Sequence, residues 1–261
     1  MVEEKQTDAK SEVITIKKEN LWKYTSVVLA IALVVVLFIH FKGPAGPTGN
    51  VVVNNQQVDA VETQPQGTSD YSFVENEALY PSIGPSDAEH TVIVFYDFQC
   101  PFCALASGLP EFSKDSQLTS QYGDLIGVEG KLRDLAAEGK IKFVFATMSF
   151  LGEESGYAGE AGLCANDQGK FEAMYDAIFT AHDGKEGNGK YNKDKLKILA
   201  KGISGVDQGK FSTCLDSNKY APTIETMTND ANTAGVTGTP SFIVDGRLMG
   251  GSWSQISALV S

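Results

Sequence analysis

The chain has 261 residues, of which 42% are apolar, so it holds enough material for one large packed domain or two small ones. Its 21 Lys and Arg stand against 33 Asp and Glu, which gives a net charge of -12. Because proteins bind nucleic-acid phosphates through Lys and Arg, this balance argues against a nucleic-acid partner.

The amino-terminal part contains an apolar segment, residues 21–41, whose centre at 27–39 is uninterrupted. At about 1.5 Å per helical residue, a segment of this length spans roughly 31 Å, about the thickness of the hydrocarbon core of a bilayer. Residues 41–47 offer no clean small-x-small cleavage site, and Trp22 and Tyr24 suit the membrane interface. We therefore predict a transmembrane signal-anchor helix, with a cleaved signal peptide and a buried core helix as the alternatives.

Lysines around this segment predict its orientation. Four of them lie at or before its start, within residues 10–23, whereas Lys42 is the only basic residue between the segment and Lys114. The positive-inside rule then makes residues 1–20 a cytoplasmic tail and places the following chain outside. We expect a single-pass protein of the cell membrane whose folded domain is extracytoplasmic. A flexible linker, residues 42–75, rich in Gly, Pro, Asn, Gln and Thr, would tether that domain.

From residue 76 onward the pattern is that of a globular domain. Two β-rich runs, residues 91–98 and 141–146, predict buried strands, and the long stretch between them suits a crossover between parallel strands. The order of elements predicts an α/β domain with an inserted helical block at about 150–234. The other predicted elements are helices at 128–138, 171–182, 193–201 and 219–234, a hairpin of strands 241–244 and 247–249, and a last helix from Ser252.

The motif Cys100-Pro101-Phe102-Cys103 lies where the first buried strand ends and a helix is expected to begin. Pro101 suits the first position of a helix. The positive end of the helix and its unpaired N–H groups favour a thiolate at Cys100, which is therefore predicted to be the exposed, attacking thiol. Cys103, one turn further on, is predicted to form a disulfide with Cys100 and to resolve mixed disulfides with a substrate.

Two other uses of a Cys-x-x-Cys motif stay open from the residues alone, namely a zinc site and a short structural disulfide. Zinc needs two further ligands, but the other cysteines, Cys164 and Cys214, lie far along the chain. The three histidines, His40, His90 and His182, show no paired ligand spacing. We therefore predict that the protein binds no metal and no cofactor.

Four segments carry a family resemblance. They read Phe-Tyr-Asp-Phe-Gln-Cys-Pro-Phe-Cys at 95–103, Gly-Lys-Phe at 169–171, Cys-Leu-Asp-Ser-Asn-Lys-Tyr at 214–220, and Gly-Val-Thr-Gly-Thr-Pro-Ser-Phe-Ile-Val-Asp-Gly at 235–246. Together they resemble the thioredoxin superfamily, and within it the membrane-anchored or secreted DsbA-like thiol-disulfide oxidoreductases. The resemblance covers roughly residues 76–261. It implies a thioredoxin fold in which the helical block is the family's insertion.

The resemblance also implies which residues surround the cysteine pair. It implies that the peptide bond between Thr239 and Pro240 is cis and that this loop packs against the pair. Thr239 would offer main-chain hydrogen bonds to an extended substrate, and Pro101 and Phe102 would belong to the same substrate-binding surface.

Two positions depart from the family pattern, and two cysteines fit it. Many relatives carry a carboxylate six residues before the first cysteine, where this chain has Val94, and strong oxidants carry His where it has Phe102. A very oxidising potential is therefore not expected. Cys164 and Cys214 fit a structural disulfide found in some relatives, the alternative being two separate buried thiols.

These features lead to an expected function. We expect an extracytoplasmic thiol-disulfide oxidoreductase that introduces disulfides into exported proteins with free thiols, by exchange at Cys100 and Cys103. Its expected partners are exported substrate proteins with free thiols or disulfides and a quinone-linked membrane redox partner. The alternatives are a disulfide reductase or isomerase with the same site, and a redox-inactive chaperone or copper-binding module of thioredoxin type.

Overall fold

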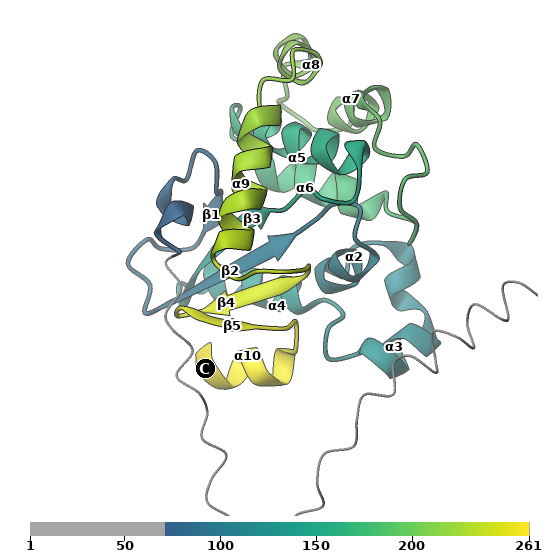
Figure 1. The fold of residues 1–261 in the computed structure, drawn as a ribbon. Coiled ribbons are helices and arrows are strands. Elements are labelled where there is room, and N and C mark those ends of the chain that lie inside the picture. The colour runs from purple at the N-terminus through teal and green to yellow at the C-terminus, as the bar shows by residue number, and fades with distance from the viewer. Residues whose placement is uncertain (1–70, 261) are drawn as a thin grey trace, which may run out of the picture. The chain divides into compact units, whose positions relative to one another are not determined.

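The computed structural model describes residues 71–260, which form a five-stranded sheet covered by helices (Figure 1). The strands are β1 (Ser82–Ile83), β2 (His90–Tyr96), β3 (Ile141–Thr147), β4 (Ser241–Val244) and β5 (Arg247–Met249). Their order in the sheet is β1-β3-β2-β4-β5. β2 and β3 run parallel, with Val92 opposite Phe143, whereas β1, β4 and β5 each pair antiparallel with their neighbours. The predicted parallel pair is therefore confirmed.

The helices expected from the sequence are present, with ends shifted by a residue or two. Short and small-residue elements were not predicted individually, among them β1 and the helix that directly follows β3. The α-helices are α2 (Pro101–Ser107), α3 (Ser116–Tyr122), α4 (Val128–Ala137), α5 (Glu153–Asn166), α6 (Phe171–Thr180), α7 (Lys193–Lys201), α8 (Gln208–Asp216), α9 (Ala221–Thr233) and α10 (Trp253–Val260), with 3-10 turns η2 (Ser72–Glu75) and η3 (Glu111–Lys114).

The sheet separates two hydrophobic clusters, because successive side chains of a strand point to opposite faces. On one face, Val92 and Val94 belong to a cluster with residues of α2, α4, α5 and α6. On the other face, Ile93 and Phe95 belong to a cluster with Met227 of α9. β2 is thus buried on both faces, which explains its continuous apolar sequence and makes it a firm base for the loop that follows it.

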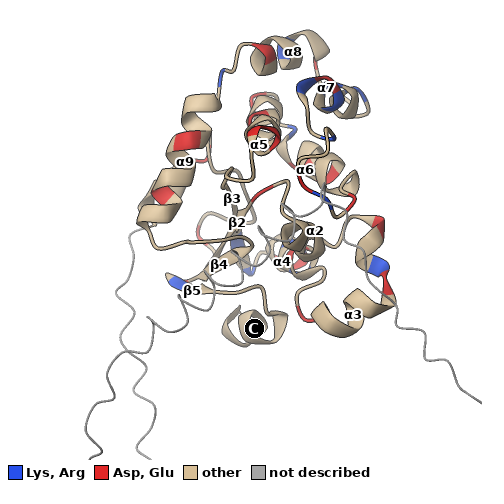
Figure 2. Cartoon of the chain, turned by 45° about the vertical axis from the view of Figure 1, so that its right-hand side comes forward, with Lys and Arg blue, Asp and Glu red and all other residues tan. Residues whose placement is uncertain are grey.

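Helices α5 to α9 form the predicted insertion between β3 and β4. A disulfide between Cys164 and Cys214 joins α5 to α8. Lysines gather on α7 (Figure 2), and one of them, Lys197, forms an ion pair with Asp216 of α8 at 2.6 Å. The insertion is therefore held together by a covalent link, ion pairs and apolar contacts.

The expected membrane-spanning segment, residues 21–41, lies outside the described residues, as do the tail at 1–20 and most of the linker. No helix within residues 71–260 is long and apolar enough to cross a membrane. At the end of the expected linker, Val74 of η2 is buried and joins the cluster under α9. Packing of the domain thus begins slightly before residue 76.

Candidate active site

Cys100 occupies the N-cap position of α2, at the end of a short turn that leaves the buried strand β2. The Cys100 N–H donates to the main-chain oxygen of Asp97 at 3.0 Å, which closes this turn. Pro101 stands in the first turn of the helix, and the Ala104 N–H donates to the Cys100 main-chain oxygen at 3.0 Å. The helix therefore begins where the sequence predicted.

Both members of the cysteine pair are free thiols in this structure. Cys103 is 0% exposed and Cys100 is 6% exposed. The expected exposed thiol is therefore mostly covered, because the Thr239 loop lies against it, and the Cys100 Sγ donates to the Thr239 main-chain oxygen at 3.4 Å. A substrate has to reach Cys100 through the small part of its surface that remains open.

The two thiols differ in their acidity. The side-chain hydrogen bond from Cys103 is the largest cause that lowers the pKa of Cys100, from an ordinary 9.0 to about 7, against the opposing effect of burial. Main-chain N–H groups of Cys103 and Phe102 add to the lowering. Burial raises the pKa of Cys103 well above its ordinary value, and the nearby Cys100 raises it further. Near neutral pH a large share of Cys100 is therefore thiolate, whereas Cys103 keeps its proton.

The Thr239–Pro240 peptide bond is cis and directly precedes β4. β4 pairs with β2, with Ser241 opposite Phe95, and this pairing brings the loop to the cysteines from far along the chain. The Thr239 hydroxyl is buried and has no hydrogen-bond partner among residues 71–260. Because this hydroxyl can donate a hydrogen bond to a thiolate, the Thr239 side chain lowers the pKa of both cysteines.

Asp97 is a buried carboxylate between β2 and the cysteine pair, and sequence reasoning gave it no role. It accepts hydrogen bonds from the Ser155 hydroxyl at 2.5 Å and from the N–H groups of Gln99, Phe150 and Leu151 at 2.8, 3.1 and 3.2 Å. Burial raises the pKa of Asp97, and these hydrogen bonds oppose that effect. Asp97 therefore fastens the segment after β3 to the turn that carries Cys100.

The position six residues before Cys100 is Val94, fully buried in β2, as the departure from the family pattern implied.

The sequence did not predict a second buried carboxylate. Glu129 on α4 is 1% exposed; its Oε2 accepts from the Tyr175 hydroxyl at 2.5 Å, and its Oε1 has no partner within the described part of the chain. Burial raises the pKa of Glu129 to about 7. No sequence signal separates Glu129 from an ordinary exposed helix residue.

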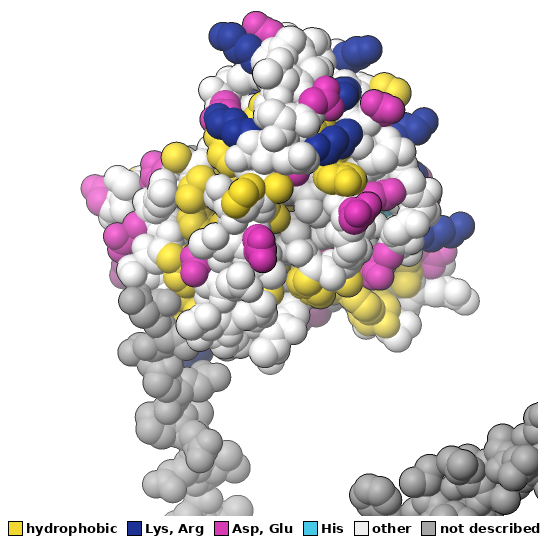
Figure 3. Space-filling view, turned by 45° about the horizontal axis from the view of Figure 1, so that its top comes forward, with side chains coloured by type: hydrophobic (Ala, Val, Ile, Leu, Met, Phe, Trp, Pro, Cys, Tyr) yellow, Lys and Arg dark blue, Asp and Glu magenta, His cyan; other side chains and the backbone are white. Residues whose placement is uncertain are grey.

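Aromatic side chains stand at the surface near the pair. Phe102, inside the cysteine motif, is 45% exposed and packs edge-to-face on Tyr122 of α3, with ring centres 5.5 Å apart. Phe150, in the segment that Asp97 holds, is 48% exposed. Apolar side chains reach the surface in patches between charged ones (Figure 3). Such patches suit contact with the apolar side chains of an unfolded polypeptide.

The residues singled out from the sequence fall into two places. The structure brings the motif and the Thr239–Pro240 loop together, and it places the Cys164–Cys214 disulfide separately, in the insertion. Among residues 71–260, no group of three or more His, Cys, Asp or Glu side chains is arranged to hold a metal ion.

The thioredoxin family model matches residues 128–261, slightly more than half of the chain. The chain belongs to the thioredoxin family. The matched part begins after the cysteine pair, so the match depends on the strands and helices that follow it. The cysteine pair is identified by its position at the start of α2, directly after β2. The predicted resemblance to DsbA-like thiol-disulfide oxidoreductases of this superfamily is confirmed.

Curated relatives of this thioredoxin-family chain are of two kinds. A probable disulfide bond formation protein D from Bacillus anthracis is 26% identical over 171 residues, which are 64% of this chain and 70% of that protein. A Na(+)/H(+) antiporter NhaA from Herminiimonas arsenicoxydans is 28% identical over 190 residues, or 71% of this chain. The chain spans only 26% of the length of that antiporter.

Solved structures share the fold. A thioredoxin-like oxidoreductase from Silicibacter pomeroyi DSS-3 is 25% identical with a TM-score of 0.56, and the match covers 73% of this chain and 95% of that one. Oxidised BdbD from Bacillus subtilis is 20% identical with a TM-score of 0.57, covering 70% of this chain and 92% of that one. The predicted thioredoxin fold with a helical insertion is therefore confirmed.

Proposed function

We propose that the protein is a disulfide donor, which oxidises pairs of thiols in exported proteins. A substrate thiolate attacks the Sγ of Cys100 in the oxidised protein, and Cys103 leaves as a thiolate that takes up a proton. The second substrate thiolate then attacks the substrate sulfur of this mixed disulfide and releases the Cys100 thiolate. The substrate loses two electrons and gains a disulfide, and the protein gains two electrons as a dithiol.

The observation that carries this proposal is the geometry of the pair: Cys100 stands at the N-cap of α2 beside a fully buried Cys103, and this arrangement lowers the pKa of Cys100 to about 7. A stabilised thiolate is a good leaving group, and stabilising the reduced state makes the disulfide easier to give away. In this proposal Thr239 and Pro240 hold an extended substrate beside Cys100. Pro101 and Phe102 contribute apolar surface to the same contact, an assignment that the exposure of Phe102 supports.

We further propose that the reaction takes place outside the cytoplasm, on a domain anchored by residues 21–41. The lysine bias around that segment supports this orientation. The similarity to the Bacillus anthracis relative, a probable disulfide bond formation protein, supports the oxidising direction. Continued turnover needs an electron acceptor, for which we propose a quinone-linked membrane protein.

The reduction potential of the cysteine pair tests the direction of electron flow. Equilibration with glutathione buffers should give a value between a cytoplasmic reductant at about -270 mV and a strong periplasmic oxidant at about -120 mV. The oxidised protein should also form disulfides in a reduced, unfolded protein. A potential near the reductant end, together with failure to oxidise that substrate, would assign the protein as a reductase.

Protease treatment of intact spheroplasts tests the location. It should remove the folded domain and leave a short membrane-bound stub that includes residues 1–20. Recovery of a soluble protein that starts after the apolar segment would identify residues 21–41 as a cleaved signal peptide.

A further inference from the structure

Gln99, the residue directly before Cys100, connects three segments of the domain. It is 1% exposed, and both polar atoms of its side chain are used. Its Nε2 donates to the Leu151 main-chain oxygen at 2.9 Å, and its Oε1 accepts from the Gly187 N–H at 2.6 Å. Its main-chain oxygen accepts from His182 at 3.1 Å. A residue adjacent to the reactive cysteine is therefore tied to two separate loops.

The first loop follows β3 and carries Phe150 at the surface. Leu151 in this loop is held by Asp97 through its N–H and by Gln99 through its oxygen. Both holding residues lie within the turn that leads to Cys100, so that turn helps to position the main chain beside the exposed Phe150. Removing the Gln99 amide would release one of these two attachments.

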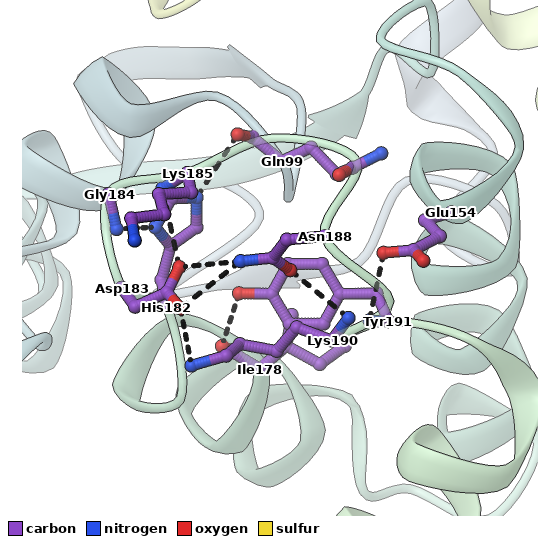
Figure 4. Close-up of polar contacts among 10 residues, drawn as sticks. All are labelled: Gln99, Glu154, Ile178, His182, Asp183, Gly184, Lys185, Asn188, Lys190 and Tyr191. Carbon is purple, nitrogen blue, oxygen red and sulfur yellow. Dashed lines mark hydrogen bonds and ion pairs between the residues drawn. The ribbon is translucent and has the colours of Figure 1, made fainter.

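The second loop joins α6 to α7, and Figure 4 shows it with Gln99 lying against it. His182, at its start, is buried; its Nδ1 accepts from the Gly184 N–H at 2.9 Å, so its Nε2 carries the proton that is donated to Gln99. Tyr191, at its far end, donates through its hydroxyl to the Ile178 main-chain oxygen at 3.0 Å. The loop is thus fixed at both ends and, at Gly187, in its middle.

The middle of this loop reaches the surface close to the reactive thiol. Lys185, Glu186, Gly187 and Asn188 are exposed. Adjacent Cα atoms are about 3.8 Å apart, and the Gly187 N–H donates to the end of the Gln99 side chain at 2.6 Å, so the middle of the loop lies at most about three residues' length from Cys100. Both loops are attached to the residue before Cys100, so they lie within reach of an extended polypeptide bound to Cys100, whereas a small thiol such as glutathione has less surface to reach either.

We propose that Gln99 is a positioning residue that holds these two loops as one recognition surface for polypeptide substrates around Cys100. This inference rests on the proposed function, because it concerns the substrate of the same site. Gln99 acts through the loops and does not exchange electrons or protons itself. It should consequently matter more for a protein substrate than for a small thiol.

The test compares two rate constants of the oxidised full-length protein, one with reduced glutathione and one with reduced, denatured ribonuclease A. Both rates are measured under conditions where circular dichroism shows that the variant is folded, because the disulfide of an unfolded chain also reacts with glutathione. Gln99→Leu keeps the size of the side chain and removes both hydrogen bonds. We expect it to lower the ratio of ribonuclease rate to glutathione rate by up to about tenfold, the range that one or two positioning hydrogen bonds provide.

Gln168 supplies a matched control. Its amide also bridges two segments through a main-chain N–H and a main-chain oxygen, both of Asp207, at 2.8 and 3.4 Å. This bridge lies between the loop after α5 and the start of α8, away from the cysteine pair. Gln168→Leu should therefore leave the ratio at the wild-type value.

His182 supplies an independent variant of the same argument. His182→Ala removes the bond to the Gln99 oxygen and should lower the ratio, whereas His182→Gln can donate from its amide and should restore it. The inference is overturned if Gln99→Leu or His182→Ala leaves the ratio at the wild-type value, or if Gln168→Leu lowers it equally. If wild-type protein oxidises glutathione but not ribonuclease, the proposed function fails and the inference fails with it. The two failures are distinguishable because the first is measured on wild-type protein and the second on the variants.

Discussion

The acidity of Cys100 should depend mainly on Cys103 and less on the start of the helix. The sequence argument assigned the low pKa to the helix start, but in the structure the largest cause is the hydrogen bond from the Cys103 side chain. Replacing Cys103 by Ala removes that donor and leaves the main-chain N–H groups in place. The pKa of Cys100 should then rise from about 7 toward or beyond its ordinary value of 9.0, since burial also favours the neutral thiol.

The size of the effect follows from the pKa values. A shift from 9.0 to about 7 corresponds to stabilisation of the thiolate by roughly 2.7 kcal/mol, at about 1.36 kcal/mol per pKa unit. Cys103→Ala should remove the larger part of this stabilisation. Cys103→Ser is the matched control, because the serine hydroxyl can still donate to the Cys100 thiolate. In this variant the pKa of Cys100 should stay closer to the wild-type value.

The assay is the rate of alkylation of Cys100 by iodoacetamide as a function of pH. In both variants the remaining cysteines, Cys164 and Cys214, are joined in a disulfide, so Cys100 is the reacting thiol. The midpoint of the rate profile gives the pKa. A midpoint near 7 in Cys103→Ala would refute the assignment and return the stabilisation to the helix start and the Thr239 loop.

Three further predictions concern buried groups. Burial raises the folded-state pKa of Glu129 from 4.5 to about 7, so its contribution to stability is present below pH 4.5 and is lost as the pH rises through 7, by about 3 kcal/mol in total. Over that pH range, urea unfolding should show Glu129→Gln becoming more stable relative to wild type. A difference that stays constant with pH would contradict this prediction. Removing the disulfide by the double change Cys164→Ala and Cys214→Ala should lower the free energy of unfolding by roughly 4 kcal/mol, because the bridge spans a sequence separation of 50. A change below about 1 kcal/mol would mean that residual structure already restricts this part of the unfolded chain. Asp97→Asn should lower the free energy of unfolding by about 2 kcal/mol and speed hydrogen exchange at the N–H groups after β3, since an amide cannot accept all four hydrogen bonds. Unchanged hydrogen exchange at these N–H groups would show that the loop is held by other contacts.

Local patterns were sufficient for the elements that present one apolar face or one apolar run. The stripe from Phe171 to Phe179 predicted α6, and the β-rich runs predicted β2 and β3. α5 was not predicted individually because its own buried residues are mostly small, such as Ala158, Ala161 and Ala165, and lie on several sides of the helix, so it lacks an apolar stripe. β1 has two residues and carries no period at all.

The cysteine motif and the proline loop were predictable because each has a characteristic local sequence. Their neighbours were not, since their roles arise only from packing between distant segments. Glu129 is buried because Tyr175, from another helix, donates to it. Sequence reasoning assigned Gln99 no role beyond its place in the motif, and it placed His182 at the end of a predicted helix. The bond between them joins positions 83 residues apart.

The Cys100 contact with Thr239 has a consequence for how the protein is made. The two residues are 139 positions apart. At about 5–20 residues per second, a ribosome needs on the order of ten seconds to add Thr239 after Cys100. During that interval the nascent chain contains both cysteines but lacks β4, the strand that carries the covering loop to β2. A nascent or truncated chain that ends before Thr239 therefore lacks the loop that covers Cys100 and the smaller contribution of Thr239 to its low pKa, so the dithiol stays more open until the last part of the sheet is added.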